Sequence, residues 1–101
     1  MALPMLWALA LSSVADMSDA NHDELLRSPA GAFVKFYAPW CGHCRKLEPT
    51  WEALSSAEAL PDATAVARVD CTKHRALCSR YGIRSFPTLL FFADEGKSVR
   101  K

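Results

Sequence analysis

The sequence has no apolar run long enough to cross a bilayer. Its most apolar stretch, residues 3–11, is far shorter than the roughly 20 residues that a membrane-spanning helix needs. It also has no excess of charge, with 12 Lys and Arg against 11 Asp and Glu, and no cationic cluster interleaved with aromatic side chains. These absences argue against both a membrane span and a nucleic-acid partner.

Cysteine is scarce, and repeats, low-complexity tracts and linkers are absent. Four cysteines are too few for a small domain held together by disulfides, yet more than chance usually leaves in a reducing compartment. With 101 residues, half of them hydrophobic, the chain suffices for one compact domain with a core. We therefore look for one functional site, based on redox chemistry or a metal.

The N-terminus has the pattern of a secretory signal peptide. The apolar stretch at residues 3–11 has the length of a signal-peptide core, and Ser13-Val14-Ala15 has the small-x-small form of a cleavage site, although no Lys or Arg precedes them. We predict a signal peptide over residues 1–15 and a domain over residues 16–101. The alternatives are an N-terminal segment that packs into the core, or an apolar leader of another kind.

Helices are predicted in three places. Residues 21–28 indicate a short helix with Asn21 as its cap, and residues 73–82 another that ends at Gly82. A longer helix should begin near Cys41. Its apolar positions recur at helical spacing and are Cys44, Leu47, Trp51 and Leu54, with Pro49 expected to kink it.

Strands are predicted between these helices. The apolar and β-branched runs at residues 32–38, 65–70 and 88–93 indicate buried strands, and residues 97–101 begin another after a turn at residues 94–96. Strands that alternate with helices are typical of an α/β sheet that is parallel at its centre, here with an antiparallel edge from the final hairpin.

Two cysteines separated by two residues lie in "FYAPWCGHCRKLEP", residues 36–49. Cys41, in the first turn of the predicted helix, would face unpaired N–H groups and the positive end of the helix dipole, which both lower a thiol pKa. We expect a partly exposed Cys41 to be the attacking thiol. Cys44, one turn deeper and covered, would resolve the mixed disulfide.

His43 lies between the two thiols. Its imidazolium would stabilise the Cys41 thiolate and favour the reduced pair, and the alternative is a solvent-facing histidine without effect. Zinc is the rival interpretation of the spacing, but Cys71 and Cys78 are separated by six residues rather than by two to four. We therefore expect no metal. Buried cysteines without chemistry are the remaining alternative.

The segments "FYAPWCGHC" and "YGIRSFPTLLFF" resemble the thioredoxin domains of the protein disulfide isomerase family, and the similarity covers about residues 14–101. The resemblance implies a thioredoxin-like α/β fold, in which helices flank a central mixed sheet. It also implies a thiol-disulfide oxidoreductase that acts on folding proteins and needs no bound cofactor. Because domains of this family continue past the last strand, we expect this chain to lack their C-terminal helix.

The resemblance assigns roles around the thiols. The Phe86–Pro87 bond would be cis and, together with Trp40, would contact an extended substrate chain; a trans proline that opens a strand is the alternative. Arg84 matches an arginine thought to help the resolving thiol lose its proton, and its alternative is a solvated loop residue. In this family His43 separates an isomerase-like site from a reductase-like one.

The resemblance also supports a structural disulfide between Cys71 and Cys78. Two residues seven apart in one straight helix are about 10.5 Å apart along its axis, which exceeds the roughly 7 Å limit for a disulfide. Cys71 would therefore lie outside the helix, with Thr72 as the cap and Lys73 as the first helical residue. Two free thiols are the alternative.

Lys35 departs from the family pattern, in which many members carry a buried glutamate at this position. The alternation in residues 33–37 directs Lys35 from a central strand toward one of the helix layers. The resemblance implies that this layer is the helix that begins near Cys41. Its ammonium either reaches solvent past the helix or stays beneath Cys44. In the second case it would favour the Cys44 thiolate and make the disulfide more oxidising.

Two functions share these motifs. The first is a disulfide oxidase or isomerase in the endoplasmic reticulum lumen, with unfolded or partly folded thiol proteins as substrates and glutathione as a redox partner. The second is a truncated thioredoxin-domain fragment that binds peptides or partner proteins without efficient turnover. Stability distinguishes the two, because a fold that lacks a helix exposes apolar sheet surface.

Overall fold

The computed structural model describes residues 14–56, 60–61 and 63–100. The predicted signal peptide therefore lies almost entirely outside the described residues. Ala15, the last residue of that predicted peptide, belongs to a two-residue strand that pairs with Ala67. None of the described helices has the length and apolar character that crossing a bilayer requires.

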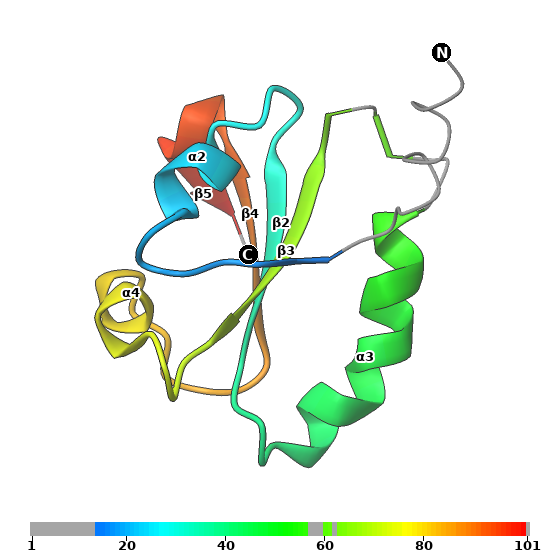
Figure 1. Ribbon diagram of the computed structural model, residues 1–101, viewed down its shortest axis with the longest axis vertical. Coiled ribbons are helices and arrows are strands. Elements are labelled where there is room, and N and C mark those ends of the chain that lie inside the picture. Colours follow the sequence, from blue (N-terminus) through cyan, green and yellow to red (C-terminus); the bar gives the residue numbers. More distant parts are fainter. Residues whose placement is uncertain (1–13, 57–59, 62, 101) are drawn as a thin grey trace.

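Five strands form one mixed sheet in the order β1-β3-β2-β4-β5 (Figure 1). The strands are β1 (Ala15–Asp16), β2 (Ala32–Tyr37), β3 (Ala65–Asp70), β4 (Thr88–Ala93) and β5 (Ser98–Arg100). The three longer strands confirm the sequence prediction to within one residue. The sequence did not indicate β1, because two residues carry no periodic pattern.

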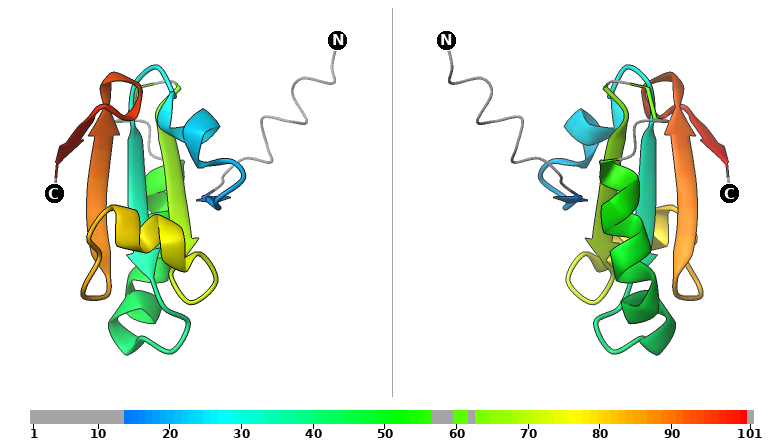
Figure 2. Two further views of the ribbon diagram at one scale, coloured as in Figure 1. Left: turned by 90° about the vertical axis from the view of Figure 1, so that its left-hand side faces the viewer. Right: turned by 90° about the vertical axis from the view of Figure 1, so that its right-hand side faces the viewer.

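Helices cover both faces of the sheet, so the predicted α/β architecture with flanking helices is confirmed (Figure 2). The helix α3 (Gly42–Ser55) packs on one face, and the short helices α2 (His22–Leu26) and α4 (Arg75–Arg80) lie on the other. The helix α3 continues through Pro49. Residues 94–96, predicted as a turn, form a single 3₁₀ turn before β5.

The antiparallel part of the sheet is larger than predicted. Strands β1, β3 and β2 are parallel, but β4 pairs antiparallel with the central strand β2 as well as with β5. Strand β3 ends at Asp70, opposite Tyr37, and β4 begins at Thr88, opposite Phe36. The connection over residues 71–87, which contains α4, therefore returns to the same end of the sheet that it left.

One predicted helix cap has the expected position and the other is wrong. Asn21 is the N-cap residue of α2, as predicted, but its side chain makes no cap hydrogen bond: its Oδ1 accepts from the Ser18 N–H at 2.7 Å instead. Thr72 does not cap α4, which begins at Arg75. The Thr72 N–H and hydroxyl both donate to the Asp70 carboxylate, at 2.9 and 2.6 Å. In both places a local turn uses the polar side chain that the sequence offered as a cap.

The core lies mainly between the sheet and the helices α2 and α4, which cover one of its faces. Val34, Phe36 and Phe92 are fully buried there. On the α3 face, Trp51 is buried and its indole N–H donates to the Ala67 carbonyl oxygen at 2.9 Å, which anchors the helix to β3. An apolar cleft of about 230 Å³ remains beside α3 and is lined by Phe33, Trp51, Leu54, Leu89, Leu90 and Phe91.

Candidate active site

Cys41 occupies the N-cap position of α3, directly after the connection from β2. Its Sγ accepts a hydrogen bond from the Cys44 N–H at 3.1 Å. The sulfur thus fills the place that a serine or aspartate oxygen fills at most helix starts, where unpaired N–H groups and the helix dipole favour negative charge. Both Cys41 and Cys44 are free thiols.

The two thiols differ in acidity. A hydrogen bond from the Cys44 side chain lowers the pKa of Cys41, and the backbone N–H groups of Cys44 and His43 and the charge of Arg45 act in the same direction, against burial. Burial raises the pKa of Cys44, and the hydrogen bond to Cys41 raises it further, while Lys35 opposes this rise. Cys41 is therefore the thiol that ionises first.

The expected difference in exposure between the thiols is wrong for this structure. Cys41 is 7% exposed and Cys44 2%, so both are buried. They pack with Ala38 and with the half-buried Tyr37 and Phe86. The two thiols nevertheless differ in acidity, because burial is the first cause of the raised pKa of Cys44, whereas hydrogen bonding is the first cause of the lowered pKa of Cys41.

His43 is exposed at the start of α3. Its backbone N–H contributes to the lowered pKa of Cys41, and the nearby side-chain charge that acts in the same direction comes from Arg45. Sequence reasoning missed Arg45. Its position one residue after Cys44, in the first turn of the helix, is the signal that could have identified it.

Three residues predicted to bind substrate gather beside Cys41. The Phe86–Pro87 peptide bond is cis, as the resemblance implied. The ring of Phe86 meets the edge of Trp40 with 5.7 Å between ring centroids. Trp40 is 67% exposed, so a large aromatic surface lies open to solvent next to the thiols. This combination of an exposed aromatic side chain and a half-buried one suits contact with an unfolded polypeptide.

Lys35 is fully buried, with 0% exposure, and faces α3, as the resemblance implied. The alternative in which its ammonium reaches solvent is thereby excluded. The Lys35 Nζ donates to Glu48 Oε2 at 2.8 Å and lies 5.4 Å from the ring centroid of Tyr37. Sequence reasoning missed Glu48, although its position four residues after Cys44 places it on the same helix face.

Arg68 is the third member of a group of charges that also contains Lys35 and Glu48. Its guanidinium donates to Glu48 Oε1 at 3.1 Å and to Asp16 Oδ1 at 2.7 Å, and it lies 3.5 Å from Glu52. The Asp16 carboxylate is the first reason that the pKa of Arg68 is raised. One carboxylate, Glu48, therefore serves two cations from neighbouring strands.

Other predicted site residues lie away from this group. Arg84 is exposed in the connection from α4 to β4, and no hydrogen bond or ion pair of its side chain occurs among the described residues.

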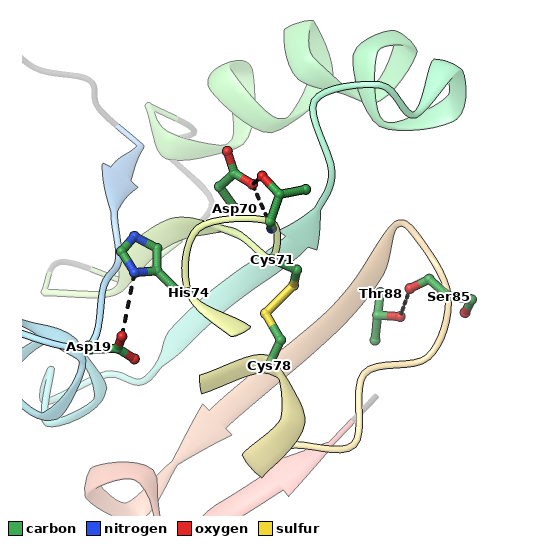
Figure 3. Close-up of a disulfide and its surroundings, with 8 residues drawn as sticks. Asp19, Asp70, Cys71, His74, Cys78, Ser85 and Thr88 are labelled. Carbon is green, nitrogen blue, oxygen red and sulfur yellow. Dashed lines mark hydrogen bonds and ion pairs between the residues drawn. A yellow bond between two sulfur atoms is a disulfide. The ribbon is translucent and has the colours of Figure 1, made fainter. Parts of the chain in front are cut away.

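Cys71 and Cys78 form a disulfide with 5.8 Å between their Cα atoms (Figure 3). Cys71 follows β3 and Cys78 lies in α4, so this bridge ties the strand to the helix on the face opposite α3.

In the described part of the chain, no three His, Cys, Asp or Glu side chains are grouped as a metal site would need. Lys35, Arg68, Glu48, Asp16 and Glu52 form ion pairs with one another.

The chain belongs to the thioredoxin family, whose model matches residues 13–101. Protein disulfide-isomerase 1 of Dictyostelium discoideum is 41% identical over 91% of this chain, and the Thioredoxin domain-containing protein 5 homolog of Drosophila melanogaster is 36% identical over 92%. Among solved structures, the zinc-bound form of human ERp44 superimposes with a TM-score of 0.77 at 35% identity over 84% of this chain.

This chain spans only part of each of these proteins. It covers 26% of the Dictyostelium protein, 22% of the Drosophila protein and 24% of the ERp44 chain. The predicted family and the predicted thioredoxin-like fold are confirmed.

Proposed function

We propose that the chain is a thiol-disulfide oxidoreductase domain that forms and rearranges disulfides in folding secretory proteins. The observation that carries the proposal is the N-cap position of Cys41. There the Cys44 N–H donates a hydrogen bond to the Cys41 sulfur, which stabilises its thiolate form. Relatives named as protein disulfide isomerases support the same class of activity.

The chemistry needs only the two thiols and the substrate. The Cys41 thiolate attacks one sulfur of a substrate disulfide, the substrate S–S bond breaks, and the second substrate sulfur leaves as a thiolate. The Cys44 thiolate then attacks the Cys41 sulfur, forms the Cys41–Cys44 disulfide and releases the first substrate sulfur as a thiol. The reverse sequence oxidises a substrate dithiol, and glutathione disulfide restores the oxidised pair.

The proposed substrates are unfolded or partly folded proteins with thiols or disulfides. Trp40, Phe86 and Pro87 lie beside Cys41, and we assign them to substrate contact. His43 is assigned to stabilising the Cys41 thiolate through its imidazolium, and Arg84 to deprotonation of Cys44. No cofactor takes part in this proposal.

The proposed compartment is the endoplasmic reticulum lumen. The disulfide between Cys71 and Cys78 supports it, because structural disulfides persist in oxidising compartments. A glycosylation-acceptor tag fused after residue 101 and expressed in secretory cells tests this assignment. Glycosylation of the tag is expected, and an unglycosylated product contradicts the assignment.

A fragment that binds peptides without turnover is the second candidate. The apolar cleft beside α3, where Leu89 is 40% exposed, favours this alternative because it offers an apolar surface away from the thiols. The two functions differ in whether the chain folds cooperatively and turns over substrate.

The deciding experiment combines a thermal melt of the purified chain with refolding of a scrambled disulfide substrate. We expect one cooperative transition and recovery of native substrate. Cys41→Ala should abolish recovery, and Cys44→Ala should accumulate mixed disulfides, because it attacks but cannot resolve them. A chain without a transition and without turnover contradicts the proposal, and trapping by Cys41→Ala instead of Cys44→Ala reverses the two roles.

A further inference from the structure

Two cations lie directly opposite each other beneath the active-site helix. Lys35 on β2 and Arg68 on β3 are register partners in the parallel part of the sheet. Like charges at neighbouring positions repel, most strongly where water is excluded, and the Lys35 side chain is fully buried. A counter-charge between them is therefore required for both to remain charged.

Glu48 supplies that counter-charge from α3. Its Oε2 accepts from Lys35 at 2.8 Å and its Oε1 accepts from Arg68 at 3.1 Å, so each oxygen serves one cation. Arg68 has further partners in Asp16 and Glu52. The only carboxylate within ion-pair distance of Lys35 among the described residues is that of Glu48.

Lys35 and Glu48 are both related to the resolving thiol, Lys35 through its charge and Glu48 through its place on the same helix. Glu48 follows Cys44 by four residues in α3, which places both on one helix face. The charge of Lys35 acts on Cys44 in the direction that favours its thiolate, whereas burial and the Cys41 sulfur act against it. A buried ammonium without a counter-ion gives up its proton, so this charge depends on Glu48.

We propose that Glu48 is a positioning residue that keeps Lys35 protonated beneath Cys44, so that the Lys35–Glu48 pair sets how readily the resolving thiol ionises. The inference deepens the proposed function and rests on it. The effect of Glu48 on Cys44 is indirect, through Lys35. Its own negative charge alone would act on the thiol in the opposite direction.

The other charged and titratable groups around the Lys35–Glu48 pair lie on β1, β2, β3 and α3. They are Asp16 on β1, Tyr37 on β2, Arg68 on β3, and Cys41 and Glu52 at or within α3. On β4 the register partner of Lys35 is Leu89, which carries no charge.

The test measures the ionisation of Cys44 directly. In a Cys41→Ser background, the rate of alkylation of Cys44 by iodoacetamide is followed against pH and assigned by peptide mass mapping. The same profile is recorded with Glu48→Gln, with Lys35→Met and with both changes together. Because alkylation needs no substrate turnover, the result stands even if the chain fails to refold scrambled substrate.

Glu48→Gln is expected to shift the alkylation midpoint of Cys44 upward, by on the order of one pH unit, because the charge of Lys35 is lost with its counter-ion. Lys35→Met should shift it in the same direction, and the double variant should match Lys35→Met. A downward shift or no shift in Glu48→Gln overturns the proposal, since either shows that Lys35 stays charged without Glu48.

Glu52→Gln is the matched control. Glu52 lies one turn further along α3 and contacts Arg68 at 3.5 Å but not Lys35, so the midpoint should not move. The melting curve shows whether Glu48→Gln folds. If it does not, the Cys44 alkylation midpoints of Lys35→Met and of the double variant are compared instead, because both variants lack the Lys35 ammonium and so bury no unpaired charge. A further shift between those two shows that Glu48 acts on Cys44 by itself and overturns the proposal.

Discussion

At the scale of single residues, the site depends on which group carries the charge near each sulfur. The pKa of Cys41 is lowered first by the Cys44 side chain and then by N–H groups of the helix that it caps. The rise in the pKa of Cys44 is opposed by a backbone hydrogen bond of Ala38 and by the charge of Lys35. An ammonium at the position of Lys35 attracts the thiolate, whereas a carboxylate there would accept the proton of the thiol. The identity of this residue therefore decides how the resolving thiol is activated.

Lys35→Met tests the effect of that charge on the redox equilibrium. Methionine keeps an unbranched stem of similar length and removes the ammonium, so the reduced pair loses stabilisation. We expect the Cys41–Cys44 disulfide to become less oxidising in equilibrium with glutathione, and mixed disulfides to be released more slowly. Identical glutathione equilibria for both proteins would show that the buried lysine has no influence on the thiols.

At the scale of elements, each face of the sheet serves a different purpose. The helix α3 carries both thiols and Glu48 on the face that contains Lys35, and Trp51 anchors the helix to β3. The opposite face holds the larger apolar core. There α4 is only six residues long, and the disulfide from Cys71 fastens it to the end of β3.

The disulfide should contribute to the stability of this second face. Its ends are seven residues apart, and closing a loop of that length is worth about 2–3 kcal/mol by chain entropy. We expect Cys71→Ala/Cys78→Ala to lower the free energy of unfolding by that amount in chemical denaturation. The Cys41→Ala/Cys44→Ala protein, which keeps the Cys71–Cys78 bridge, is the control. Ready alkylation of both Cys71 and Cys78 in natively purified protein would refute the bridge.

At the scale of the whole molecule, the connection from β2 to α3 and the segment with Phe86 and Pro87 lie at the same end of the sheet (Figure 1). The antiparallel entry of β4 brings this about, because β4 begins where β2 ends. A parallel β4 would have placed Pro87 at the opposite end. The topology therefore assembles the thiols and the proposed substrate-contacting residues from segments far apart in the chain.

The acidity of Cys41 should appear in the stability of the whole reduced chain. A thiol whose pKa is lower in the folded state stabilises the fold above the unfolded value of about 8.5 and loses this contribution as the pH falls through the folded pKa. The free energy of unfolding of reduced wild type, minus that of Cys41→Ser, should therefore rise with pH from the lowered folded pKa up to the unfolded value of about 8.5. Cys44 is present in both proteins, so a flat difference would mean that the Cys41 pKa is not lowered.

Much of the fold followed from local patterns. The strands at residues 65–70 and 88–93 have the predicted bounds, and α3 begins one residue after Cys41, because apolar runs and helical spacing depend on neighbouring residues alone. The spacing of Cys41 and Cys44 identified the thiol pair, and the alternation in β2 directed Lys35 toward one of the helix layers. These features are properties of single elements.

The remainder depended on contacts between elements. The cap hydrogen bonds of Asn21 and Thr72 were lost to local turns, and the direction of β4 was decided by the end of the sheet to which the connection with α4 returns. The partner of Lys35 was decided only when α3 packed on the sheet. Glu48 is one of several charged residues in that helix, and only the packing selects the one that reaches a buried ammonium, because a buried charge requires a partner wherever the fold supplies it.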